Sequence, residues 1–181
     1  MQPTFHYEQE KAIAALMYIC DYLGGEWDKY SLLKILYFAE QKHLAKYGRP
    51  ISGDYIVAMK HGPVPSNSYN LVKPQYANPN FTEDEENIIK INGKPDLDAL
   101  SESDIECLIE SINENRNYGF WRLRAKSHDN AYNNTVETKG LDATIPFIDI
   151  AISGGAQPSM VEYIKHNLEL QNCSFNGAPS W

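Results

Sequence analysis

The sequence predicts a mainly α, α+β fold: one single-domain helical bundle that carries a small two- or three-stranded β element. Apolar residues recur at helical spacing over long stretches, glycine or proline follows several of these stretches, and the runs rich in strand formers are short. A chain of 181 residues with 43% hydrophobic content suits one well-buried core. We expect this domain to cover residues 1–171 and a C-terminal tail to cover residues 172–181.

Two long helices are expected near the N-terminus. Helical spacing of apolar residues predicts the first over residues 7–23, where a glycine pair follows. A wide apolar stripe predicts the second over residues 29–47, and Gly48 supplies its end. Because the connection between them is short, we expect the two helices to pack against each other.

The β element is expected in the middle of the chain. Residues 55–59 form a short apolar run of strand formers, and the Gly-Pro-Val-Pro segment at 62–65 predicts a rigid turn, with a helix over residues 66–73. Residues 88–91 predict a second strand, which we expect to pair with the first.

The C-terminal half is expected to be helical. Ser101 with Asp104 three residues later is typical of a capping box and predicts a helix start. A short helix is predicted over residues 120–127, then a polar loop, a helix over residues 145–152 and a last helix over residues 158–170.

Composition narrows the classes of protein. No apolar run is long enough for a membrane span, and the first ten residues lack the pattern of a secretory signal, so we expect a cytoplasmic protein. Cys20, Cys107 and Cys173 are widely spaced and form no ligand pattern, and we expect the first two in the core. The five histidines form no metal motif, and no phosphate-binding glycine loop is present. We therefore expect no catalytic activity, metal or cofactor.

Charge is distributed unevenly along the chain. The net charge of −8 argues against nucleic acid as a partner, since phosphate binding needs clustered Lys and Arg. Residues 29–73 nevertheless carry seven basic and two acidic side chains. Two interpretations stay open for this window: a solvated basic face, or a patch that faces a protein partner. A second basic cluster at residues 116–126 surrounds Phe120 and Trp121, and we expect it to pair with nearby carboxylates.

Three consecutive segments carry a resemblance to a known family. They are Lys34–Glu40 (KILYFAE), His43–Pro50 (HLAKYGRP) and Tyr55–Pro65 (YIVAMKHGPVP). Together they resemble the Panacea domain of the SocA-like antitoxins, which also occurs in phage-associated proteins. Leu100–Ile105 and the pair His128 and Tyr132 resemble later parts of that domain, although the family has Trp where this chain has Tyr132. That difference implies a repacked last third or a different partner.

The resemblance implies an antitoxin of a toxin–antitoxin system that neutralises a cognate protein toxin by direct binding. The alternative that the family allows is a proteolytic adaptor, which delivers a toxin or another protein to a protease. A small enzyme or a nucleic-acid-binding regulator is a third and weaker alternative. Some relatives carry an extra DNA-binding module, for which we see no room before the first helix.

The turn after the first predicted strand is the expected site of partner binding, since recognition residues often lie on loops held by rigid elements. The candidate partner-binding residues are Tyr37, Lys60, His61, Gly62, Pro63 and Pro65. For Tyr37, core packing is the preferred alternative, and for the turn a purely structural role is an equal one. His128 is a minority functional candidate: a helix would place it over Tyr132, and a buried histidine with a structural role is the default interpretation.

Overall fold

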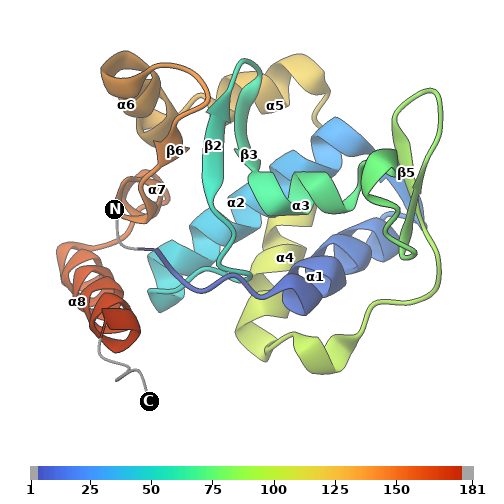
Figure 1. Cartoon of the computed structure of the whole chain (residues 1–181). Helices are drawn as coiled ribbons and strands as arrows, with labels where there is room; N and C mark the ends of the chain where they lie inside the picture. The colour runs from blue at the N-terminus through green and yellow to red at the C-terminus, as the bar shows by residue number, and fades with distance from the viewer. Residues whose placement is uncertain (1–3, 177–181) are drawn as a thin grey trace.

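The computed structural model describes residues 4–176, with side chains described as far as residue 171. The fold is mainly helical with two small antiparallel sheets, which confirms the predicted class (Figure 1). The α-helices in this range are α1 (Gln9–Tyr22), α2 (Lys29–Tyr47), α3 (Ser66–Leu71), α4 (Glu102–Asn115), α5 (Phe120–Ser127), α6 (Asn130–Lys139), α7 (Phe147–Ser153) and α8 (Pro158–Asn176). None of the helices in residues 4–176 combines the length and apolarity that crossing a bilayer requires.

Helix α2 lies at the centre of the domain (Figure 1). Every residue from 31 to 40 is buried, because apolar side chains surround this part of the helix on all sides. Leu32, Ile35 and Leu36 join one core cluster with α1 and α4, whereas Phe38 and Leu44 join a second cluster with α5, α7 and α8. One helix therefore holds both halves of the core together.

The strands form two sheets of three strands each, with orders β1-β5-β4 and β3-β2-β6. The strands are β1 (Glu26–Asp28), β2 (Ile56–Met59), β3 (Gly62–Pro65), β4 (Phe81–Glu83), β5 (Ile88–Ile91) and β6 (Thr144–Ile145). The prediction that residues 88–91 pair with the first strand is wrong, since β5 pairs with β1 and β4. Strand β2 instead finds its partners in β3, directly after it, and in the distant β6.

Strands β2 and β3 form a hairpin whose turn contains only two residues, 60 and 61. The segment at 62–65 was expected as a turn but is a paired strand, in which Pro65 lies opposite Ile56. Proline fits here because β3 is an edge strand, and an edge strand needs no N–H on its outer side. The hairpin therefore consists of a two-residue turn and four antiparallel residue pairs.

The C-terminal third differs most from the expectation. Helix α6 forms where a polar loop was predicted, and the Asp129 side chain caps its start. Only Ala131, Tyr132 and Thr135 are buried along this helix. So few buried positions give a weak helical pattern. Ile145 belongs to β6 rather than to α7, and α8 extends to residue 176 instead of ending at 170. Cys20 and Cys107 are buried as expected, whereas the side chain of Cys173 lies outside the described part.

The connector after α2 is held by a buried carboxylate. Glu40 accepts hydrogen bonds from the backbone N–H of Ile51 (2.5 Å) and Ser52 (3.0 Å) and from the Ser52 hydroxyl (2.5 Å). Burial raises the pKa of Glu40, and these three donors oppose that rise. The carboxylate thereby fixes the path of the chain into β2.

We expect Glu40→Gln to lower the free energy of unfolding by about 1 to 3 kcal/mol, because the new NH₂ group must face a buried donor. Urea denaturation followed by circular dichroism measures this. The matched control is Glu169→Gln on the exposed face of α8, which should change stability by less than about 0.5 kcal/mol. Equal effects of the two substitutions would show that Glu40 does not fix the connector.

Candidate functional site

The hairpin tip is the exposed part of the expected partner-binding segment. Lys60 and His61 at the turn are exposed, whereas Gly62, Pro63 and Pro65 are buried in β3. The tip lies beside α5 (Figure 1). Of the turn residues predicted to contact a partner, the structure therefore places two at the surface and three beneath it.

Three side chains anchor the main chain on both sides of the tip. The Tyr30 hydroxyl donates to the carbonyl oxygen of His61 (2.9 Å), and the Lys34 ammonium donates to that of Pro63 (2.6 Å). From α6, the Tyr132 hydroxyl donates to the carbonyl oxygen of Met59 (2.9 Å). Helices α2 and α6 thus hold the tip without using its own side chains.

Gly62 is required by this arrangement. Its φ is +104°, and a Cβ at this position would lie 2.5 Å from Ser127 Oγ and 2.8 Å from Lys34 Nζ. Only glycine adopts such an angle without strain while leaving room for a neighbouring amine. The small residue lets the hairpin pack directly on the end of α5 and on α2.

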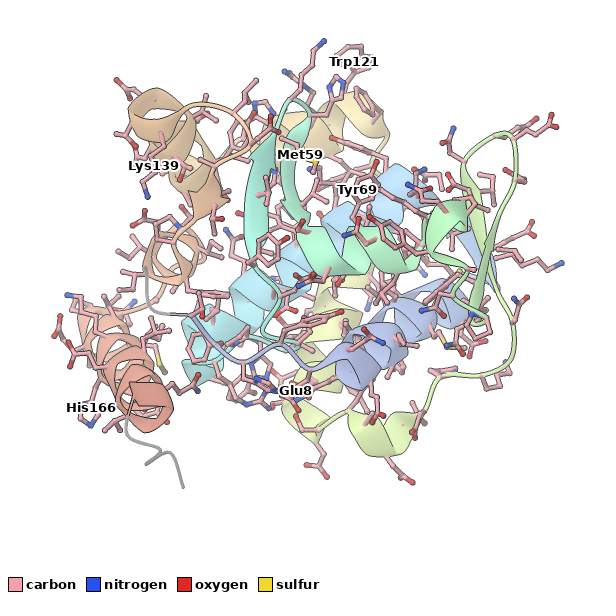
Figure 2. All side chains as sticks on the ribbon, viewed as in Figure 1. Glu8, Met59, Tyr69, Trp121, Lys139 and His166 are labelled. Carbon is pink, nitrogen blue, oxygen red and sulfur yellow. The ribbon has the colours of Figure 1, made fainter. Side chains whose placement is uncertain are left out.

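An aromatic group extends the exposed tip. The Phe120 ring lies 4.5 Å from Tyr30 and 5.5 Å from His61, measured between ring centroids, and Trp121 contacts Phe120 edge to face at 5.0 Å. Trp121 is 76% exposed and projects from the body of the protein (Figure 2). We define Lys60, His61, Phe120 and Trp121 as the tip surface.

Phe120 and Trp121 were not among the predicted partner-binding residues. In the sequence they stand among arginines some sixty positions after the hairpin, so only their aromatic character marked them. Trp121, at 76%, is the most exposed large hydrophobic side chain in the described part of the chain. Spatial proximity to His61 is what assigns them to the same surface.

Lys34 lies beneath the tip, and only 1% of its surface is exposed. Its amine lies 5.2 Å from the centroid of the Tyr30 ring. Burial lowers the pKa of Lys34 to about 7, and the charge of Asp129 opposes this shift only in part. The Lys34 amine, at the centre of the anchoring contacts, therefore loses its proton far more readily than the amine of an exposed lysine.

Tyr37 lies deeper and has no exposed surface. Its hydroxyl donates to Asp129 Oδ2 (2.7 Å), which also accepts from Gln41 Nε2 (2.8 Å), while Oδ1 caps α6 at the backbone N–H of Tyr132 (3.0 Å). Tyr37 is therefore packed in the core, which was the preferred interpretation of this residue. Its contribution to the site is to hold the start of α6, and with it the anchor Tyr132.

His128 and Tyr132 do stack, with ring centroids 4.2 Å apart, but not on one helix. His128 ends α5, and Tyr132 lies in the first turn of α6. Burial lowers the pKa of His128, and the nearby charges of Arg124 and Lys34 add to the shift, which favours the neutral ring. The imidazole therefore acts as a packing surface behind the tip.

Four of the seven basic side chains in the window at residues 29–73 form ion pairs within the domain. Lys42 and Lys46 pair with glutamates of α4, at distances down to 2.6 and 2.5 Å. Lys29 pairs with Glu83, and Arg49 with Asp104. The excess charge is thus used to join elements within the domain. In the second cluster, Lys126 pairs with Glu114 of the preceding helix as expected, and Arg122 stacks on Tyr118.

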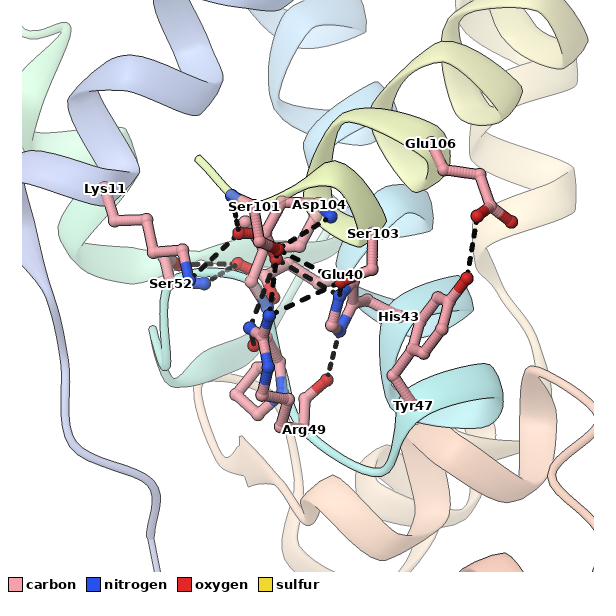
Figure 3. Close-up of polar contacts among 12 residues, drawn as sticks. Lys11, Glu40, His43, Tyr47, Arg49, Ser52, Ser101, Ser103, Asp104 and Glu106 are labelled. Carbon is pink, nitrogen blue, oxygen red and sulfur yellow. Dashed lines mark hydrogen bonds and ion pairs between the residues drawn. The ribbon is translucent and has the colours of Figure 1, made fainter. Parts of the chain in front are cut away.

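The densest group of charges surrounds Asp104, where α1, α2 and α4 meet (Figure 3). Its carboxylate, fully buried, lies 3.0 Å from Lys11 Nζ and 3.1 Å from both His43 Nε2 and Arg49 Nη1. It also completes the predicted capping box with Ser101. Burial alone would raise the pKa of Asp104, but the hydrogen bonds from His43, Ser101 and Lys11 outweigh it and hold the pKa well below its usual range.

This cluster has the chemistry of a structural cross-link. His43 Nδ1 donates to the carbonyl oxygen of Arg49 (2.8 Å), while Nε2 also meets the Ser103 hydroxyl (3.0 Å). Both nitrogens are occupied, so neither is free to take a proton from a substrate. Among the described residues, no three His, Cys, Asp or Glu side chains are arranged to hold a metal ion.

Comparison with known proteins places the chain in a family. Its fold is a small helical domain with one anchored, exposed hairpin. The family model described as antitoxin SocA-like, Panacea domain, matches residues 32–132, which is more than half of the chain. The chain therefore belongs to the SocA-like Panacea family. No curated protein and no solved structure gives a significant match.

The titration of Lys34 predicts a pH-dependent stability. In the unfolded chain the Lys34 amine has an ordinary pKa of about 10.4, whereas in the folded protein its pKa is about 7. The unfolded state thus binds more protons between these values, so stability rises with pH. Relative to Lys34→Met, the wild type should gain about 3 kcal/mol in free energy of unfolding from pH 7 to 9.5. Urea denaturation of both proteins measures this, and parallel pH profiles would contradict it.

Gly62→Ala should destabilise the protein by about 1 to 3 kcal/mol more than Gly93→Ala. Gly93 is a matched control, because its φ of +105° imposes the same backbone strain while no atom lies within 4 Å of the added Cβ. The difference in the free energy of unfolding isolates the contact with Ser127 and Lys34. If both variants lose the same amount, close packing under the hairpin is not what requires glycine.

Proposed function

We propose that the protein is an antitoxin that neutralises a cognate protein toxin by binding it through the tip surface. The observation that carries the proposal is the exposed pair Phe120 and Trp121, seated beside the anchored turn. Membership of an antitoxin family supports a toxin as the partner. No catalytic step is needed for this function.

The composition of the tip surface supports a protein partner. Tryptophan and other aromatic residues are enriched among the residues that dominate binding energy, especially where they cluster with cationic side chains. Lys60 supplies a cation for which the described part of the chain offers no ion-pair partner, and His61 supplies a polar ring edge. A large apolar side chain such as Trp121 gains most when a partner removes it from water.

Rigidity supports the same conclusion. The backbone around the tip is fixed by Tyr30, Lys34 and Tyr132 before any partner arrives. Binding to such a surface costs little conformational entropy, which leaves more of the contact energy as affinity. We propose simple occlusion of the toxin as the mechanism, because a preformed surface can cover an active site without a further component.

Trp121→Ala should weaken toxin binding at least about thirtyfold and abolish rescue of growth on co-expression with the toxin, as expected for a hot-spot residue. The toxin to test is sought among the small proteins encoded beside this gene, as the one tolerated only on co-expression. The matched control is Tyr76→Ala, since Tyr76 is also largely exposed, at 56%, but lies outside the tip surface. Affinity is measured by calorimetry and the fold by circular dichroism.

Two results would contradict the proposal. One is full rescue by a folded Trp121→Ala protein that also carries Lys60→Ala and His61→Ala, which would place the interface elsewhere. The other is rescue that disappears in a host lacking its cytoplasmic proteases, because occlusion needs none of them. That second result would support the adaptor function instead.

A further inference from the structure

A cavity of about 550 Å³ opens beside the hairpin tip. The turn at residues 60–62 forms one wall, and the first residues of α2 form another. Leu33, Val64 and the rings of Tyr30 and Tyr69 give it an apolar lining. Its size suits one or two side chains of a bound protein, and it adjoins the tip surface through the shared residues Lys60 and His61.

Lys34 lines this cavity and is buried there without a counter-ion. Its ammonium group donates a hydrogen bond to a neutral acceptor, the carbonyl oxygen of Pro63. Among the described residues no carboxylate oxygen lies within 4.0 Å of its amine. Asp129 is the acid whose charge raises the pKa of Lys34, and its carboxylate already accepts hydrogen bonds from Tyr37, Gln41 and the α6 backbone.

Such a lysine is costly to keep, because buried charges in proteins are almost always paired. An ammonium group has three donors, and the carbonyl of Pro63 occupies one of them. Asp28, Glu86 and Asp142 also line the cavity. Asp28 caps α2 at the backbone N–H of Ser31, and the other two are exposed, so water screens them more than it screens Lys34.

We propose that the cavity receives an acidic side chain of the bound toxin, whose carboxylate pairs with Lys34 while its methylene groups contact Leu33 and Val64. The inference rests on the proposed function and identifies the chemistry of the partner at that site. The pair forms away from water, where a charge-assisted hydrogen bond is stronger than at an exposed position. The aromatic tip then supplies affinity, and the cavity selects for an acidic residue.

The first experiment needs no toxin. N-acetyl-glutamate N-methylamide and the matching glutamine compound differ only in carboxylate against carboxamide, and both are titrated into the wild-type protein by NMR. We expect the glutamate compound to shift the signals of Lys34, Leu33 and Val64, and to bind at least about tenfold more tightly than the glutamine compound. Equal binding of the two, or shifts outside the cavity, overturns the inference.

The second experiment uses Lys34→Met, which keeps an unbranched side chain one atom shorter and removes the buried amine. The variant should lose the preference for the glutamate compound and bind the toxin at least about tenfold more weakly. Unchanged toxin affinity overturns the inference. Failure of the proposed function is recognised separately. The variants at Trp121, Lys60 and His61 report on toxin binding, whereas the two small compounds report on the cavity whether or not a toxin binds.

Discussion

The architecture depends on one constraint: the central part of helix α2, residues 31–40 together with His43, is buried and still carries polar side chains. Lys34, Glu40 and His43 of α2 have almost no access to water, so each must find a partner within the protein. Lys34 takes a carbonyl of the hairpin, Glu40 takes the amides of the connector, and His43 takes the start of α4 together with Arg49. Each polar residue of α2 thereby fixes the position of another segment, which apolar packing alone would leave less specific.

The residues matched by the family model begin and end close to two anchors of the hairpin. The match begins two residues before Lys34 and ends at Tyr132, and these two residues anchor opposite strands of the same hairpin. The matched segment thus contains the hairpin and two of its three anchors, whereas the third anchor, Tyr30, and the paired strand β6 lie outside it. Helices α1 and α8 lie outside the match and complete the two halves of the core.

Sequence patterns predicted what depends on local physics. The bounds of α2 and the capping box at Ser101 were found because apolar spacing, Gly48 and a short polar motif act within a few residues. Pairings between distant segments were not, as the wrong partner for β5 shows. For the same reason the sequence indicated only two of the four residues of the tip surface. Lys60 and His61 are in the predicted turn itself, whereas Phe120 and Trp121 come close to it only through the tertiary fold. The charge of the basic window at residues 29–73 gave no unique interpretation, because Lys29, Lys42, Lys46 and Arg49 form internal ion pairs that only the tertiary fold reveals.

The way in which the hairpin is anchored has a consequence for evolution. Tyr30, Lys34 and Tyr132 hold the hairpin through its carbonyl oxygens, and a carbonyl oxygen is the same whatever side chain its residue carries. The two residues of the turn can therefore change identity without loss of their supports, and the fold tolerates substitutions there that it would reject one residue further on, at Gly62. A domain built in this way can diverge towards new partners by mutation at its tip while its interior stays the same.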